Sequence, residues 1–194
     1  VLREIIKQEN NIEFLVTTTT LSSSNLIKDE FKEFKNLQHR FFPFDVDFLV
    51  KKFLELWKPD VIFFIDSEIW PNLIFNAKKN NIPMVILNGR ITRKTFKRWL
   101  IIPNFSKKLF NYFDLCLCSN LETKKFLLLL NAKNVYYTGN IKLAKSIDNH
   151  KINSSNQKIL SNLKFWIAAS THEPEEDLCI KTHQLLKRKF KKIT

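Results

Sequence analysis

The stretch Ile-Asp-Ser-Glu-Ile-Trp-Pro-Asn-Leu, residues 65–73, joins a predicted strand to a predicted helix. It follows the apolar run 61–65. Pro71 suits the first turn of a helix, because an N–H there has no partner inside the helix. Two carboxylates, Asp66 and Glu68, therefore stand where a parallel strand ends, which is where open α/β sheets bind their ligands.

A purely structural interpretation is equally open for this stretch taken alone. Glu68 or Ser67 can cap the helix, since short polar and acidic side chains accept the free N–H groups of a first turn. Trp70 can pack in the core as an ordinary large apolar side chain. The remaining sequence has to decide between the two interpretations.

Short apolar runs alternate with amphipathic segments through residue 140, which predicts strands followed by helices. The predicted strands are residues 12–17, 39–42, 61–65, 85–87, 115–118 and 135–137. The predicted helices are residues 24–34, 46–57, 70–80, 92–112 with a break at Pro103, and 121–131. Strands that are apolar on both faces favour a parallel sheet covered by helices on both sides. The predicted class is α/β with a Rossmann-like parallel sheet.

The pattern changes after residue 140, which predicts three segments. Residues 1–140 form an N-terminal domain, and the polar residues 141–162 form a linker. Residues 163–194 begin a second domain, with a strand at 165–169 and an acidic helix start at 173–177. One strand and one helix cannot cover a sheet, and Val1 stands in mid-pattern. We therefore expect a fragment, with the true N-terminus and most of the second domain lying outside it.

Several blocks resemble, in the same order, the bacterial 3-deoxy-D-manno-octulosonic acid (Kdo) transferases, a family of GT-B glycosyltransferases that act on lipid A. Residues 65–73 are similar to the family's Glu-Thr-Glu-Leu-Trp-Pro-Asn-Leu. The sequence departs from the family at Asp66, where Glu is usual, and at Pro174, where Gly is usual. The other five matching blocks are residues 15–20, 42–45, 88–90 (Asn-Gly-Arg), 138–142 (Thr-Gly-Asn-Ile-Lys) and 168–176.

The resemblance implies transfer of Kdo from the donor CMP-Kdo to a hydroxyl of the lipid A precursor (lipid IVA), with inversion at the anomeric carbon and no cofactor. It implies that residues 1–140 form the acceptor domain of a GT-B enzyme and that residues 163–194 begin the donor domain. The family's general base is a Glu in a Gly-Glu loop that follows the first strand of the acceptor domain. That strand and loop are both expected to precede Val1. We therefore expect the isolated chain to be inactive, and we assign no other residue as the base.

The resemblance also assigns two catalytic residues. Asp66 corresponds to a carboxylate that stabilises the transition state. Lys142 corresponds to a lysine that accepts the growing charge of the departing phosphate. On sequence alone, Lys142 can instead be a solvated linker lysine. The residues expected to bind substrate are Glu68, Arg90, Thr18, Thr20, Asn140, Ser170, Thr171, His172 and Glu173.

Three of these assignments have structural alternatives. Thr18 and Thr20 equally suit an ordinary hydroxyl-rich loop. Arg90 can touch an acceptor phosphate or pair with a carboxylate. Residues 170–172 can cap the helix that Pro174 opens, which is compatible with contact to the donor.

The chain of 194 residues carries 32 Lys and Arg against 19 Asp and Glu, a net charge of +13 that favours an acidic partner. A biased codon composition explains part of this excess. The cluster 90–98 mixes basic residues with Phe96 and Trp99, which suits an anionic membrane surface. A solvated helix face is the alternative. The cluster 187–192 is typical of an exposed helix end. No apolar run reaches the roughly 18 residues of a membrane span.

The spacing of the cysteines and histidines narrows the possible classes of function. Three cysteines without framework spacing suggest a reducing compartment, and the four histidines lack the spacing of metal ligands. We therefore expect no metal and a cytoplasmic location, and the resemblance implies the cytoplasmic face of the bacterial inner membrane. Another GT-B enzyme that uses a nucleotide sugar is one alternative. A basic nucleic-acid-binding module is a weaker alternative, because no such motif is present and most aromatics fall on apolar faces.

Overall fold

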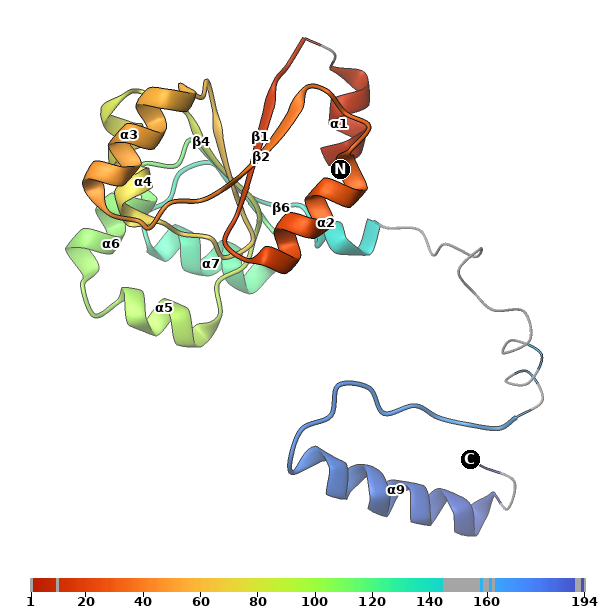
Figure 1. The fold of residues 1–194 in the computed structure, drawn as a ribbon. Helices are drawn as coiled ribbons and strands as arrows, with labels where there is room; N and C mark the ends of the chain where they lie inside the picture. Colours follow the sequence, from red (N-terminus) through yellow and green to blue (C-terminus); the bar gives the residue numbers. More distant parts are fainter. Residues whose placement is uncertain are drawn as a thin grey trace. The chain divides into compact units, whose positions relative to one another are not determined.

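The structure, a computed structural model, describes residues 2–9, 11–144, 158, 161, 163–190 and 193. These fall in two compact units, Val1–Lys145 and Ser146–Thr194, which are described separately. Figure 1 shows the elements of each unit in sequence colours.

Six parallel strands of the first unit form two sheets. The first sheet pairs β1 with β2, and the second has the order β3-β4-β5-β6. The strands are β1 (Phe14–Thr18), β2 (Leu37–Phe41), β3 (Ile62–Ile65), β4 (Met84–Gly89), β5 (Leu115–Cys118) and β6 (Val135–Tyr137). All pairing is parallel, as the sequence predicts, but the described strands make two sheets where one was expected.

Helices connect successive strands, and several begin at a polar cap. Thr20, Thr92 and Asn120 each accept the backbone N–H of the residue three positions on, which starts α2, α5 and α7. The helices of this unit are α1 (Leu2–Gln8), α2 (Leu21–Phe31), α3 (Asp47–Trp57), α4 (Pro71–Lys79), α5 (Arg93–Trp99), α6 (Pro103–Phe110), α7 (Leu121–Leu129) and the 3-10 helix η1 (Ile141–Ala144). The break expected at Pro103 separates α5 from α6, whereas α1 and η1 were not predicted.

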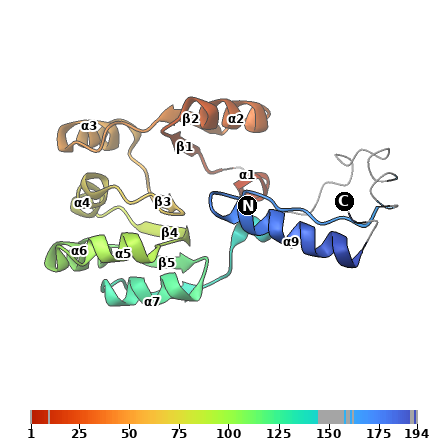
Figure 2. The ribbon, with the colours of Figure 1, turned by 90° about the horizontal axis from the view of Figure 1, so that it is seen from below.

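The hydrophobic core lies between one face of the β3–β6 sheet and helices α4, α6 and α7. Phe64, Ile86 and Cys116 are buried on that face. Ile74, Phe110 and Leu127 face them from the three helices and are also buried. Figure 2 shows β3, β4 and β5 following one another with α4, α5, α6 and α7 alongside them.

The opposite face of the same sheet is open. Phe63 is 55% exposed, and Ile65 and Tyr136 are exposed on that face as well. The physical reason is the handedness of parallel connections. Right-handed crossovers that advance in one direction along a sheet place all their helices on the same side. The expectation that helices cover both faces therefore holds for only one face of β3–β6 among the described residues.

The second unit contains the helix α9 (Glu175–Lys189), with three acidic residues in its first turn and three basic residues in its last. Both sets of charges complement the helix dipole. The strand predicted at 165–169 is wrong, because this segment forms no ladder, and the neighbouring Lys164 makes only an isolated bridge to Ile193. Most of the predicted linker, residues 145–157, lies outside the described residues, as do Lys191 and Lys192.

Each described helix is too short or too polar to cross a bilayer.

Candidate functional site

Asp66 is the first residue beyond β3, and its backbone is tied to the end of β4. Its N–H donates to the carbonyl of Leu87 at 3.1 Å, and its carbonyl accepts the N–H of Arg90 at 3.1 Å. Asp66 adopts φ +57, a left-handed conformation that Asp and Asn tolerate better than most residues. The two bonds and this turn fix the carboxylate at the carboxyl end of the sheet.

Lys142 reaches the same point from the other end of the unit. Gly139 (φ +81) turns the chain after β6, and Asn140 Oδ1 accepts the N–H of Lys142 at 3.1 Å, which helps to form η1. Lys142 Nζ then lies 2.6 Å from Asp66 Oδ2. The structure therefore brings together the two residues predicted to be catalytic, and Lys142 is not a solvated lysine without a partner.

Asn88 links Asp66 to the residue directly before Lys142, and it was not among the predicted site residues. Its Nδ2 donates to Asp66 Oδ1, and its Oδ1 accepts the backbone N–H of Ile141 at 3.1 Å. The side chain is buried and the residue has φ +57. The sequence does contain a feature that points to Asn88. An Asn-Gly pair directly after an apolar run predicted to be a strand is typical of a turn with positive φ.

Gly89 lies tightly against the Ile86 side chain of its own strand below this site. A Cβ at Gly89 would lie 2.7 Å from Ile86 Cγ2, which no real structure accommodates without a shift. The register of β4 on β5 also shifts between Ile86 and Gly89. The Ser119 hydroxyl donates to the Gly89 carbonyl at 2.9 Å and holds the end of β5 against this turn. Close packing here explains the glycine of the Asn-Gly-Arg block.

Glu68 and Arg90 differ from Asp66 in having free side chains. Both are exposed, and neither makes an ion pair or a side-chain hydrogen bond within the described part of the chain. The alternative that Arg90 pairs with a carboxylate is therefore not observed. Its carbonyl instead accepts the hydroxyl of Ser67 at 2.6 Å. Contact of Glu68 and Arg90 with substrate stays a prediction.

The N-terminus of α4 is capped by Asp45, and not by Glu68 or Ser67. Asp45 Oδ2 accepts the N–H of Asn72 at 2.9 Å, and Oδ1 accepts the N–H of Leu73 at 3.0 Å. Trp70 precedes the helix without a capping side chain. The structural interpretation of Glu68 and Ser67 as caps is wrong, because the helix begins too far along the chain for them and a loop residue already fills the position. Packing of Trp70 is confirmed by its ring contact with Phe42 at 5.3 Å.

Thr18 and Thr20 have structural partners on β2 and α2. Thr18 Oγ1 lies 2.9 Å from His39 Nε2, and Thr20 caps α2 through Ser23. Burial, followed by the nearby charges of Lys28 and Arg40, lowers the pKa of His39. Both hydroxyls therefore stabilise the loop after β1, and contact with a sugar stays a prediction.

The predicted residues of the second unit surround the start of α9. Ser170 has φ +57, and Thr171 is half-buried. The backbone N–H of His172 donates to Glu175 Oε2 at 3.1 Å. The N-cap residue Pro174 makes no side-chain cap bond, and among the described residues no side chain of 170–172 is seen to cap α9. Contact of Ser170, Thr171, His172 and Glu173 with the donor stays a prediction.

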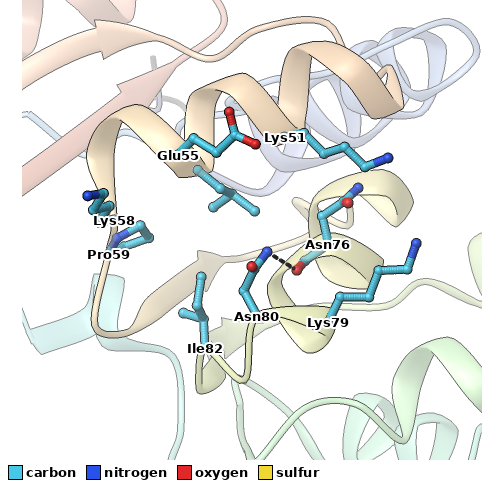
Figure 3. Close-up of a pocket in the computed structure, with 9 residues that line it drawn as sticks. Lys51, Glu55, Lys58, Pro59, Asn76, Lys79, Asn80 and Ile82 are labelled. Carbon is cyan, nitrogen blue, oxygen red and sulfur yellow. Dashed lines mark hydrogen bonds between the residues drawn. The ribbon is translucent and has the colours of Figure 1, made fainter.

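A pocket of about 510 Å³ lies at the opposite edge of the sheet from Asp66. Figure 3 shows Lys51 and Glu55 of α3 facing Asn76 and Lys79 of α4 across it, with Asn80 Nδ2 donating to the Asn76 carbonyl at 2.8 Å. Its floor includes Ile82, which precedes β4. Parallel sheets bind ligands at the carboxyl ends of their strands, and this pocket is at the amino ends. We therefore place the site at Asp66.

The cysteines take no part in the site. Burial raises the pKa of Cys116 to about 12 and that of Cys118 to about 11, so both thiols stay protonated and unreactive. Among the residues that the structure describes, no three His, Cys, Asp or Glu side chains gather as a metal site would require.

A solved structure shows the same fold. The S. aureus MnaA-UDP co-structure superimposes with a TM-score of 0.52 over 94% of this chain and 60% of its own, at 13% sequence identity. The α/β, Rossmann-like class is thereby confirmed, with the chain corresponding to the N-terminal part of a GT-B fold.

Proteins related in sequence are more informative about the family than the structural neighbour is. A probable mitochondrial 3-deoxy-D-manno-octulosonic acid transferase of Arabidopsis thaliana is 32% identical over 96% of the chain and 43% of its own length. The 3-deoxy-D-manno-octulosonic acid transferase of Rickettsia typhi is 32% identical over 97% of the chain and 41% of its own length. That of Haemophilus influenzae is 27% identical, over 97% and 45% respectively. The chain spans less than half the length of these curated relatives.

The profile of one protein family covers the whole first unit. The family is described as 3-Deoxy-D-manno-octulosonic-acid transferase (kdotransferase), and it matches residues 1–145, from α1 to the end of η1. The matched region contains Asp66, Asn88 and Lys142, which meet at the carboxyl end of the sheet. The chain belongs to the 3-deoxy-D-manno-octulosonic acid (Kdo) transferase family.

Proposed function

We propose that the full-length protein transfers Kdo from CMP-Kdo to a hydroxyl of the lipid A precursor, with inversion at the anomeric carbon. The observation that supports this proposal is the Asp66–Lys142 pair, 2.6 Å apart at the carboxyl end of β3, in a chain of the Kdo transferase family. Such a pair places one cation and one anion where open α/β sheets bind their ligands.

In the proposed reaction the acceptor oxygen forms a bond to the anomeric carbon, and the bond from that carbon to the phosphate oxygen breaks. The leaving group is CMP, which departs with the electron pair of the broken bond. The acceptor's proton passes to a general base that we do not assign to any residue of this chain. Negative charge therefore grows on the phosphate, and positive charge grows on the sugar ring.

Lys142 and Asp66 suit these two developing charges. The Lys142 ammonium donates to the phosphate oxygen as its charge grows, which lowers the barrier because the interaction strengthens in the transition state. The Asp66 carboxylate holds the ammonium in place beforehand and stabilises positive charge on the sugar. The half-buried carboxylate and exposed ammonium leave the pair accessible to a ligand.

The direct test is incubation of the full-length protein with CMP-Kdo and lipid IVA, followed by mass spectrometry of the lipid. The expected product carries added Kdo and appears together with CMP. Parallel reactions contain a UDP-sugar in place of CMP-Kdo, and these are expected to leave the lipid unchanged. Transfer from the UDP-sugar, or no transfer from CMP-Kdo, would contradict the proposal.

We also propose that the acceptor domain binds the anionic, cytoplasmic surface of the bacterial inner membrane through α5, α6 and the turn between them. The turn 100–102 exposes three apolar side chains, with Ile101 77% exposed. Exposed basic residues flank it on both helices, at Lys94, Lys97, Arg98, Lys107 and Lys108. Apolar side chains with a basic rim suit the boundary between anionic headgroups and acyl chains.

The aromatic residues of this cluster do not share that role. Phe96 stacks on Phe126 at 4.2 Å, and Trp99 packs edge-on against Phe110 at 5.4 Å. Membrane binding is tested by sedimentation with phosphatidylglycerol vesicles, with phosphatidylcholine vesicles as the reference. Ile101→Ser is expected to weaken binding to the anionic vesicles. The exposed Leu128→Ser on α7 is the matched control, and equal loss in both variants would contradict the proposed surface.

A further inference from the structure

The Asn88 side chain links Asp66 of the catalytic pair to the backbone that carries Lys142. Its Nδ2 donates to the Asp66 carboxylate, and its Oδ1 accepts the N–H of Ile141, the residue directly before Lys142. With the Lys142–Asp66 ion pair, these bonds close a ring of contacts between the end of β3, the end of β4 and η1. The residue is 2% exposed, so water does not compete for either bond.

The chemistry of this position requires an amide. The group must donate to a carboxylate at one end and accept from a backbone N–H at the other, and Asn does both with one planar group. An aspartate offers only acceptors when ionised, and an aliphatic side chain offers neither function. The left-handed backbone, φ +57, further favours Asn over most residues.

We propose that Asn88 is a positioning residue that fixes the Lys142 ammonium relative to the Asp66 carboxylate; its catalytic consequence rests on the proposed function. Lys142 needs such support because it lies on a 3-10 helix of four residues and its flexible side chain is largely exposed. A preorganised site tolerates displacements of only about 0.5 Å. Loss of the Asn88 bonds releases η1 from the sheet and lets the ammonium move by more than that.

The decisive variant is Asn88→Asp in the full-length protein, because Asp keeps the shape and tolerates the backbone conformation. Its kcat at pH 8 is expected to fall roughly tenfold to a hundredfold, the cost of a misplaced catalytic group, with little change in KM. Among the described residues, the charged group that contacts position 88 is Asp66, which in turn pairs with Lys142. Two adjacent carboxylates share one proton as the pH falls, and the protonated one can donate as the amide did. The ratio of variant to wild-type kcat is therefore expected to rise toward pH 5.5.

The chain offers a matched control in Asn76→Asp. Asn76 is likewise 2% exposed, and its Nδ2 donates to the carboxylate of Asp47 at 2.9 Å, far from the site. This variant is expected to lower the unfolding midpoint without changing kcat or its pH profile. Equal kcat losses in both variants, or a flat pH ratio in Asn88→Asp, would overturn the positioning role.

Hydrogen exchange provides a readout that does not depend on activity. In Asn88→Gly, which tolerates positive φ, the amide of Ile141 loses its acceptor and is expected to exchange at least about tenfold faster. The amide of Leu143 donates to the Asn140 carbonyl and serves as the internal reference. Unchanged exchange at Ile141 would overturn the inference. If exchange at Ile141 is accelerated in Asn88→Gly but the wild-type full-length protein transfers no Kdo, the positioning role of Asn88 is retained and the proposed function is refuted.

Discussion

The ammonium of Lys142 lies 2.6 Å from the carboxylate of Asp66, although 76 residues separate the two in sequence. The Lys142 side chain is 67% exposed and that of Asp66 is 31% exposed. Exposed ion pairs contribute only about 0 to 1 kcal/mol to stability. The pair therefore contributes little to the folded state, and its importance lies in where it places two charges.

Replacement of Lys142 separates catalysis from stability. In the full-length enzyme, Lys142→Ala is expected to lower kcat by on the order of 10² to 10³, the typical cost of losing one electrostatic contact to the transition state. The KM for the acceptor and the unfolding midpoint are expected to change little. Steady-state kinetics measure kcat and KM, and thermal unfolding measures the midpoint. Wild-type turnover in this variant would contradict a catalytic role for Lys142.

Asp66 and Glu68 are expected to respond differently to loss of charge. Asp66→Asn removes the partner of Lys142 and is expected to impair kcat severely. Glu68→Gln is expected to retain most activity, because the Glu68 side chain is exposed and outside the hydrogen-bond ring. Its unfolding midpoint is also expected to stay unchanged, since Asp45 caps α4. A correctly folded but inactive Glu68→Gln variant would show that the two carboxylates have exchanged roles.

Asp45→Ala is expected to destabilise the first unit. The variant leaves the N–H groups of Asn72 and Leu73 without their acceptor. Loss of an N-terminal cap costs about 0.5 to 2 kcal/mol of unfolding free energy. Urea unfolding measures the change, with Glu68→Gln as the control on the same helix-forming segment. Equal midpoints for the two variants would mean that water replaces the cap at no cost.

His39 is expected to make stability depend on pH. Its pKa is lowered from the usual 6.5 in the folded state, so folding favours the neutral ring. Stability from this group is present above the unfolded pKa and is lost as the pH falls through the folded one. Unfolding midpoints measured from pH 7.5 to pH 5 are expected to fall less steeply in His39→Gln than in the wild type. Identical slopes would contradict a role for His39.

The three cysteines are expected to differ in reactivity. At pH 8 the native protein should react with a thiol reagent at Cys179 alone, because burial raises the pKa of Cys116 to about 12 and that of Cys118 to about 11. Cys179 lies half-buried on α9. Peptide mass spectrometry after brief alkylation identifies the modified residues. Rapid modification of Cys116 under native conditions would disprove burial of β5.

Local features of the fold could be predicted from sequence because they depend on neighbouring residues. The break at Pro103 follows from the missing N–H of proline, and it appears between α5 and α6. The apolar run before Asp66 forms β3, and Pro71 opens α4. Strand ends in a parallel sheet gather at one edge, which is why Asp66 could be placed near a ligand without a structure.

Features that depend on distant residues could not be predicted from the residues alone. The Asp45 cap reaches across 27 residues to Asn72, whereas helix caps are normally sought next to the helix. The bridge from Asn88 to Ile141 spans 53 residues and needs the register of three strands. The resemblance assigned catalytic roles to Lys142 and Asp66, but it did not predict that they contact each other. The strand at 165–169 was wrong because an apolar run becomes a strand only when another strand pairs with it.

The open face of the β3–β6 sheet affects how the chain behaves when it is produced alone. Phe63, Ile65 and Tyr136 present apolar surface that no described helix of the first unit shields. Such surfaces promote self-association, whereas the net charge of +13 opposes it through repulsion. Added salt screens the repulsion and leaves the apolar attraction intact. Preparations of this chain are therefore expected to remain dispersed in dilute buffer and to form larger particles as the salt concentration rises.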